Sequence, residues 1–390
     1  MINKINQFFD RIFYTPKPLP PGKFNSLLTI DGNLYRLHLR IENDGSGILI
    51  LNASTILHLN QTATEIAYHM INNTEPDEIA AQMVKRYQVT RDLALQDIDE
   101  FEERIETLIK TPDLDPETFL DMERVGRHTA GFEIPLRLDC AVTYQTSSGG
   151  ADIYAPTKRV DRDLTTEEWN HILDQAWDWG IPHVVFTGGE PTLRPDLQEL
   201  IEHAEVLGQV TGLITDGSRL VDTEYFQKLL TSGLDHLMLI LNEQEEFSWE
   251  AIRDAVNEDI HFTVHFTITE SNQEDLVSIL EKLIAIGVRN VSFSAASKSL
   301  EKRLLEASQY ASENELTLIY DLPVPYSEHN PLNLELEEDL TALKGAARSW
   351  LYVEPDGDVL PAQGYTNRLG NLLIDNWMNV SINRKVYLQQ

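Results

Sequence analysis

The sequence predicts an α/β protein built from two folded parts, and two patterns of apolar residues support this. Between residues 25 and 110, short runs of apolar residues are followed by three amphipathic helical segments. From residue 135 onward, short apolar runs and helical segments alternate steadily. The first pattern is typical of a winged-helix domain with three strands and three helices. The second predicts a parallel sheet with helical crossovers, and its length fits a partial (β/α)6 barrel.

The elements of the first part follow from its turn and capping residues. Apolar runs on either side of Asn43–Gly45 predict two strands joined by a tight turn, and Thr55–Leu59 predicts a third strand. The helices are expected to begin behind Asn60, Thr74 and Thr90, since Asn and Thr favour the N-cap position.

The second part is expected to alternate between strand and helix six times before a last apolar run, Thr317–Val324. The predicted strands are Leu136–Tyr144, His183–Gly189, Val210–Gly217, His236–Asn242, His261–Thr269 and Val288–Ala295. The predicted helices are Leu164–Gly180, Asp196–Gly208, Glu224–Gly233, Ser248–Val256, Asp275–Gly287 and Ser299–Glu315.

Five segments follow from these patterns. The N-terminal arm carries the apolar run FFDRIFY among basic residues, and it fits either a surface-seeking amphipathic helix or a solvated terminus. A polar stretch rich in Asp, Pro and Gly is typical of a linker. The predicted segments are the arm at 1–24, the winged-helix domain at 25–110, the linker at 111–134, the barrel at 135–345 and a C-terminal extension at 346–390.

Charge and composition exclude several partners and locations. The formal net charge of -32 comes from 63 acidic and 31 basic side chains, and a field of that sign repels phosphate backbones, so nucleic acid is not an expected partner. No apolar stretch reaches the roughly 18 residues that a membrane span needs, and the N-terminus lacks the apolar region of a signal peptide. The single cysteine excludes an intrachain disulfide, so the cytoplasm is the expected location.

Two motifs lie on the first two predicted strands of the barrel, LRLDCAVTYQ (Leu136–Gln145) and VVFTGGEPTLRPDL (Val184–Leu197). They resemble radical S-adenosylmethionine (AdoMet) enzymes. The resemblance implies a loop after the first strand with three cysteines, which hold a 4Fe-4S cluster while AdoMet chelates its fourth iron. Here the loop reads TYQTSSGGADIYAPTKRV, and the chain's one cysteine, Cys140, lies within the preceding strand. Because iron-sulfur clusters are held by thiolates, no 4Fe-4S cluster is expected.

The turn Gly188-Gly189-Glu190-Pro191 is the most specific motif that remains. It ends a predicted parallel strand, where such folds place ligand sites, and its glycines let backbone approach a ligand closely. The family resemblance implies that Gly188, Gly189 and Glu190 meet the amino group of AdoMet. The residues alone fit equally a tight turn from strand to helix. AdoMet is therefore the one cofactor that stays open.

In the first part, the order of elements and the junction TILHLNQTATEIAYHMI resemble the PqqD-like family, also called the RiPP recognition element. RiPPs are ribosomally made, post-translationally modified peptides. The resemblance covers roughly Asn25 to Lys110 and implies that the leader of a precursor peptide pairs with the edge of the third strand, at Thr55, Ile56, Leu57, His58 and Leu59. An exposed edge offers the backbone donors and acceptors that such a peptide needs. A domain that only braces its neighbour is the alternative.

The C-terminal segment WLYVEPDGDVLPAQGYTNRLGNLLIDNW (Trp350–Trp377) resembles the SPASM or twitch extension of peptide-modifying radical AdoMet enzymes. Ala362 stands where that extension has a cysteine. The turn composition of Pro355–Asp358 predicts a hairpin. His261 and His265 would lie on one face of a strand, but roughly 13 Å apart, which makes them a poor metal pair. No catalytic residue and no metal ligand is predicted.

The sequence thus predicts a degenerate radical AdoMet protein, a pseudoenzyme without cluster ligands. Its expected partners are a precursor (leader) peptide, an active radical AdoMet maturase, or both. The first alternative is an AdoMet- or small-ligand-binding enzyme of non-radical type that uses the pocket at Gly188–Pro191. A purely structural scaffold is the second.

Overall fold

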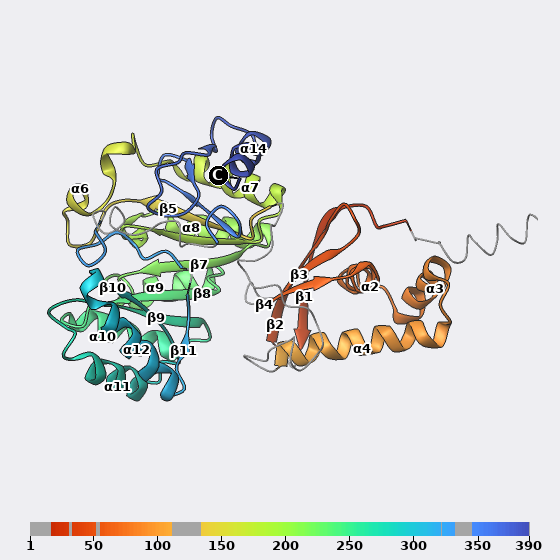
Figure 1. Ribbon diagram of the computed structural model, residues 1–390, viewed down its shortest axis with the longest axis horizontal. Coiled ribbons are helices and arrows are strands. Elements are labelled where there is room, and N and C mark those ends of the chain that lie inside the picture. The colour runs from red at the N-terminus through yellow and green to blue at the C-terminus, as the bar shows by residue number, and fades with distance from the viewer. Residues whose placement is uncertain are drawn as a thin grey trace, which may run out of the picture. The chain divides into compact units, whose positions relative to one another are not determined.

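The computed structural model of the chain describes residues 17–30, 33–51, 55–110, 134–320, 322–331 and 345–389. The chain divides into two compact units, Met1–Gly126 and Arg127–Gln390 (Figure 1). Most of the predicted arm and nearly all of the predicted linker lie outside the described residues.

Among the described residues of the first unit, four antiparallel strands form a sheet in the order β1-β2-β3-β4. These are β1 (Gly22–Ile30), β2 (Asn33–Ile41), β3 (Gly47–Leu51) and β4 (Thr55–Leu59), followed by α2 (Gln61–Ile71), α3 (Pro76–Tyr87) and α4 (Arg91–Lys110). The three predicted strands and three predicted helices are confirmed. The prediction missed β1, which crosses the expected boundary between arm and domain at residues 24 and 25, because proline-rich sequence precedes it and its apolar residues do not alternate regularly.

Local chemistry explains the main boundaries of this unit. At the turn between β2 and β3, Gly45 adopts a positive φ of 85°, and the Asp44 carboxylate accepts hydrogen bonds from the backbone N–H and the hydroxyl of Ser46. The Asn60 side chain accepts from the Ala63 amide and caps α2. One apolar core joins all three helices to β2, β3 and β4. Its central side chains include Leu49, Leu57, Ile79 and Ile98, which are buried completely.

In the described part of the second unit, ten strands form one sheet in the order β11-β10-β9-β8-β7-β6-β5-β12-β13-β14. The strands that precede the C-terminal extension are β5 (Arg137–Thr143), β6 (His183–Gly188), β7 (Val210–Thr215), β8 (His236–Leu241), β9 (His261–Ile268), β10 (Asn290–Ala295) and β11 (Thr317–Leu318). Each is parallel to its neighbours. The crossover helices are α7 (Thr166–Trp179), α8 (Leu197–Leu207), α9 (Thr223–Thr231), α10 (Glu246–Val256), α11 (Leu276–Ile286) and α12 (Glu301–Glu313). The predicted series of six strand-helix pairs is confirmed. The last apolar run, in contrast, contributes only Thr317 and Leu318 to the sheet.

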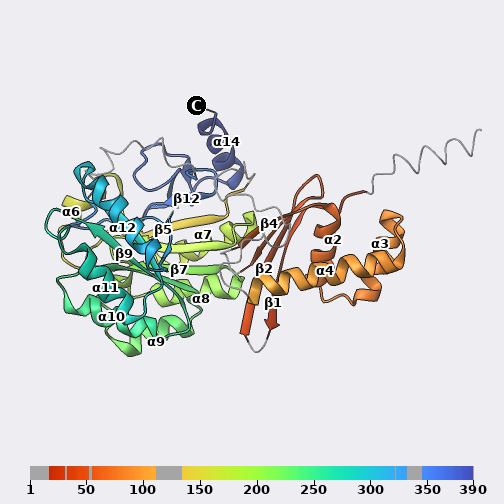
Figure 2. The same cartoon turned by 60° about the horizontal axis from the view of Figure 1, so that its bottom comes forward.

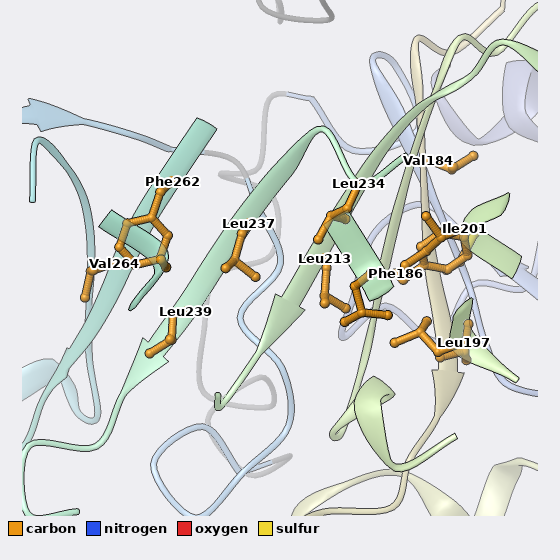
Figure 3. Packing of buried hydrophobic residues seen from close by; sticks show 14 of the residues in the cluster. Val184, Phe186, Leu197, Ile201, Leu213, Leu234, Leu237, Leu239, Phe262 and Val264 are labelled. Atoms are coloured by element: carbon orange, nitrogen blue, oxygen red, sulfur yellow. The ribbon is translucent and has the colours of Figure 1, made fainter. Parts of the chain in front are cut away.

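The crossover helices of this unit pack on one side of the strands, as Figure 2 shows for α9, α10 and α11. Alternate residues of the strands point to these helices, and Figure 3 shows part of the resulting core, with Phe186, Leu213 and Leu239 among its members. The other set of strand residues lines the inner side of the sheet, where Val185, Ile214 and Met238 pack together. The inner side therefore carries the positions from which a barrel site would be built.

The C-terminal extension continues the sheet beyond β5. β12 (Trp350–Val353) pairs with β5 in parallel, and β13 (Asp358–Leu360) and β14 (Gly370–Asn371) follow in antiparallel order before α14 (Trp377–Tyr387). The predicted hairpin turn at Pro355–Asp358 is confirmed, with Gly357 at a φ of 89°. None of the helices in the described residues has the length and apolar character needed to cross a bilayer.

Candidate functional site

The turn after β6 is built by a close approach of two backbone segments. Gly188 has a φ of 133°, and a Cβ atom there would lie 2.1 Å from the carbonyl oxygen of Thr143 at the end of β5. A Cβ on Gly189 would lie 2.1 Å from the carbonyl oxygen of Gln145. The two segments are joined by hydrogen bonds from Gly189 N to Thr143 O (2.9 Å) and from Glu190 N to Gln145 O (2.6 Å). Both glycines are thus required by packing of the chain against itself.

The Glu190 side chain is buried and fixes the turn after β6 to the turn after β7. Its Oε1 accepts hydrogen bonds from Thr192 N (2.9 Å), Thr192 Oγ1 (2.5 Å) and Thr215 Oγ1 (2.7 Å), and its Oε2 accepts from Asp216 N (2.7 Å). A carboxylate has about four acceptor sites, so these donors use most of its capacity. Burial, with help from nearby Asp216, raises the pKa of Glu190 to about 8, against the lowering effect of the hydrogen bonds.

The residues present do not fit a 4Fe-4S cluster. Cys140 is completely buried among the apolar side chains between β5 and the helices, and burial raises the pKa of its thiol well above the ordinary value. The predicted position of Cys140 within the strand is confirmed. The hydroxyl groups of the loop after β5 already have hydrogen-bond partners. Ser147 Oγ lies 3.1 Å from Ser218 Oγ in the turn after β7, and Thr146 Oγ1 donates to Gly149 O (2.6 Å). Neutral hydroxyls are poor ligands for iron in such a cluster.

A buried aromatic and ionic cluster holds the beginning and end of this loop to the C-terminal extension. The Tyr144 hydroxyl donates to Glu354 Oε1 (2.8 Å), and Arg159 Nε donates to the same oxygen (2.7 Å). Burial raises the pKa of Glu354, and the guanidinium of Arg159 opposes that effect. The Tyr352 hydroxyl lies 3.5 Å from that of Tyr144. This cluster could not be predicted from the sequence, because its members are up to 210 residues apart.

A second polar group on the inner side of the sheet was also missed. His265 is 1% exposed, and its ring nitrogens lie 3.0 Å from the hydroxyls of Ser292 and Ser294 on β10. Thr267 completes the group. Burial lowers the pKa of His265 to about 4, so its imidazole is neutral at pH 7 and offers one donor and one acceptor. Alternation of polar residues along β9 is the signal in the sequence that indicates this group, since His265 and Thr267 lie two residues apart on one face of the strand.

No group of three or more His, Cys, Asp or Glu side chains arranged to hold a metal ion occurs in the described ranges. His261 is exposed at the start of β9, whereas His265 is buried. The inner side of the sheet can offer hydrogen bonds from the neutral imidazole of His265 and from the hydroxyls of Ser292 and Ser294.

The first unit presents an open sheet edge at β4, since only β3 pairs with this strand in the part of the chain that the structure describes. A hydrogen bond from Glu42 N to Ser46 O (2.8 Å) continues the β2–β3 ladder. Because hydrogen-bonded and non-hydrogen-bonded pairs alternate along an antiparallel ladder, the even-numbered residues of β3 are the ones whose backbone groups bond to β2. Ile48, which bonds to β2, lies opposite His58. The backbone N–H and C=O groups of His58, and by alternation of Ile56, therefore point away from β3 to the open edge.

The predicted peptide-binding residues thus divide into two groups. Leu57 and Leu59 are 0% and 3% exposed and belong to the core. Thr55 is the first residue of β4, where its register places it opposite Leu51. The backbone groups of Ile56 and His58 point away from β3, which is the direction in which a further strand would pair with β4.

Family models match both units. The model of the radical SAM superfamily matches residues 140–295, and that of coenzyme PQQ synthesis protein D (PqqD) matches residues 47–107. Curated relatives include two proteins described as PqqA peptide cyclase. The one from Streptomyces rochei is 39% identical over 97 residues, which are 25% of this chain and 26% of that protein. The one from Granulibacter bethesdensis is 25% identical over 236 residues, which are 52% of this chain and 60% of that protein. The matches span less than two thirds of either relative.

Solved structures with a similar fold include SuiB from Streptococcus suis. SuiB bound to S-adenosylmethionine gives a TM-score of 0.55 at 16% identity, covering 88% of this chain and 86% of SuiB. SuiB bound to its precursor peptide SuiA gives a TM-score of 0.56 at 16% identity, covering 92% of this chain and 88% of SuiB. At this level of identity the likeness concerns the fold alone.

Proposed function

Because this chain combines a PqqD domain with a radical SAM domain, we propose that it binds a precursor peptide with its first unit and performs no radical chemistry with its second. In this proposal residues 25–110, together with the start of β1, form the peptide-binding part. Residues 135–345 form a degenerate barrel, and residues 346–390 form its extension.

Peptide binding is supported above all by the position of β4 at the edge of the sheet that the described residues form. Ile56 and His58 direct backbone donors and acceptors outward, while Leu57 and Leu59 anchor the strand in the core. An extended peptide gains affinity from such main-chain hydrogen bonds, because it adds one more strand to the sheet. The anchored side chains keep the strand rigid, so little ordering is needed on binding.

The relatives support the same class of partner. SuiB was crystallised with a precursor peptide, and the curated relatives are described as cyclases of the peptide PqqA. We extend only the peptide-binding role to this chain. A leader peptide bound at β4 would be presented to an active radical SAM maturase, which is the second partner in the proposal. Both partners would be met in the cytoplasm.

The lack of radical chemistry is supported by the ligand chemistry of the loop at residues 144–163. A cluster with AdoMet on its fourth iron needs three thiolates, and the chain has one cysteine, which is buried on the helix side of β5. Ala362 in the extension adds no ligand either, because a methyl group cannot bind iron. Peptide binding by the first unit requires no redox centre.

A substitution at the β4 edge tests the proposal. In His58→Pro the outward N–H is lost, while the bonds of β4 to β3 stay in place, since proline is tolerated at the open side of an edge strand. We expect the affinity for a fluorescein-labelled synthetic peptide, encoded beside this gene, to fall by about tenfold or more in fluorescence anisotropy. His58→Ala retains the N–H and controls for loss of the imidazole.

The opposite edge of the same sheet supplies a matched control. β1 pairs with β2 alone among the described strands, and the same alternation directs the backbone groups of Asn25 outward. Asn25→Pro should therefore leave peptide affinity unchanged. Equal losses for His58→Pro and Asn25→Pro, or no loss for either, would count against docking at β4.

A second candidate function is binding of AdoMet or another small ligand without radical chemistry. It is favoured by the neutral hydrogen-bonding group around His265, which lies on the inner side of the sheet beside half-buried Ser292 and Ser294. Isothermal calorimetry with AdoMet separates the two candidates. Micromolar binding of AdoMet would support the second, and its absence together with peptide binding would support the first.

A further inference from the structure

The segment that follows β11 crosses the inner side of the sheet. β11 is at one edge of the sheet, five strands away from β6. Only eight residues later, the Tyr326 amide donates to the carbonyl oxygen of Gly188 at the end of β6 (2.9 Å). Neighbouring strands are about 4.8 Å apart, and eight extended residues reach at most about 28 Å. Eight residues are therefore long enough to reach from β11 to the end of β6.

The contacts of this segment fix its place. Leu322 packs against Val185, Ile214 and Met238, which are the apolar residues of the inner side. The Tyr326 side chain is 1% exposed. Its ring meets that of Tyr144 edge-on, with a centroid distance of 5.3 Å.

Two further groups hold the segment in this position. Gln363 Nε2, from the extension, donates to the carbonyl oxygen of Val324 (2.7 Å), and Asn330 Nδ2 donates to the same oxygen (2.6 Å). Pro323 and Pro325 flank that carbonyl group. Prolines restrict the unfolded chain and have no N–H that needs a partner, so a proline-rich extended segment can lie against an apolar surface at small entropic cost.

We infer that Leu322–Tyr326 is an internal strap that closes the inner side of the sheet and takes the place of a ligand at the Gly188 turn. A ligand with an ammonium group, such as AdoMet, needs acceptors at this turn. One of them, the Gly188 carbonyl, bonds to Tyr326 N, and the Glu190 carboxylate is engaged by Thr192, Thr215 and Asp216. With Tyr326 buried against this turn, we expect the strap to occupy the space of such a ligand and to exclude AdoMet from the second unit. The inference does not depend on peptide binding by the first unit.

Thiol labelling tests the strap, and the chain contains its own internal control. Met238 is 1% exposed beneath the strap, whereas Cys140 is buried on the helix side of the same sheet. In Met238→Cys, the new thiol should react slowly with a maleimide. Adding Tyr326→Pro, which removes both the ring and the amide donor, should raise that rate by about tenfold or more. Adding Tyr326→Phe, which retains the ring and the amide, should leave the labelling rate of the Met238→Cys thiol low.

Cys140 distinguishes strap opening from general unfolding, because it should stay unlabelled in all three proteins. Equal labelling rates with Tyr326→Pro and Tyr326→Phe would overturn the inference. If Tyr326→Pro exposes Cys140 as well, hydrogen exchange on the unaltered chain decides instead. The Tyr326 amide should then be strongly protected, and exchange at the rate of an unstructured amide would overturn the inference.

Equilibrium dialysis with radiolabelled AdoMet tests the exclusion directly. No saturable binding is expected up to about 1 mM AdoMet. Saturable binding while the Tyr326 amide stays protected would overturn the inference. The peptide titration on His58→Pro is unaffected by either outcome, so failure of the strap and failure of the proposed function can be told apart.

Discussion

Gly189→Ala should destabilise the second unit by about 3–5 kcal/mol, because the new methyl group has no space. Its carbon would lie 2.1 Å from Gln145 O and 2.9 Å from the carbon of the same carbonyl group. These are backbone atoms, so no side chain can swing away, and the segment after β5 must retreat by about 1 Å. The retreat breaks the bonds Gly189 N to Thr143 O and Glu190 N to Gln145 O.

The magnitude follows from these losses. Each hydrogen bond contributes a net ~1 kcal/mol, and forcing a methyl group into a packed site costs ~1–3 kcal/mol. Gly149→Ala is the matched control. Gly149 has a φ of 74°, but nothing lies within 4 Å of its added Cβ, so only backbone strain of ~1 kcal/mol is expected there.

Urea denaturation followed by tryptophan fluorescence measures both variants. All six tryptophans lie between Trp169 and Trp377, so the signal reports the second unit alone. If Gly189→Ala costs no more stability than Gly149→Ala, the glycine is not there for close packing. A role for the turn in ligand contact would then be the better explanation.

Two further predictions concern buried carboxylates of the second unit. The pKa of Glu190 is raised to about 8 from an ordinary value near 4.5, so the folded protein binds the extra proton between these pH values and its stability falls as pH rises through that window. Glu190→Gln cannot bind or release this proton. In thermal denaturation from pH 5 to pH 9, the variant should therefore gain stability relative to the parent protein as the pH rises. A difference in stability between the two proteins that does not change with pH would indicate that Glu190 stays ionised. Arg159→Leu leaves the buried Glu354 carboxylate without its cation and should cost about 3–5 kcal/mol in urea denaturation. The double variant Arg159→Leu, Glu354→Leu should cost less than Arg159→Leu alone, and a larger cost would contradict the pairing.

Sequence periodicity predicted the six strand-helix pairs of the second unit, since both faces of β5, β6, β7 and β9 are buried and the crossover helices are amphipathic. The same reasoning failed at Thr317–Val324. Its apolar residues predict one strand, but only Thr317 and Leu318 join the sheet, because Pro323 and Pro325 have no N–H to donate to a ladder, and Leu322 packs against the inner side instead.

The candidate site could be predicted only in part. The position of Gly188 and Glu190 at the end of a strand followed from the sequence. The partners that use Glu190, and the contact of Tyr326 with Gly188, did not, because such contacts depend on how loops after different strands meet. For the same reason, the outward backbone groups of His58 required the strand register, which sequence spacing does not supply.

Anaerobic reconstitution with iron and sulfide tests most directly the claim that the second unit lacks radical chemistry. The purified chain, incubated with ferrous iron and sulfide, desalted and then reduced in the presence of AdoMet, should retain no stoichiometric iron and release no 5′-deoxyadenosine. Brown protein with about four irons and four sulfides per chain, and with reductive cleavage of AdoMet, would contradict the account.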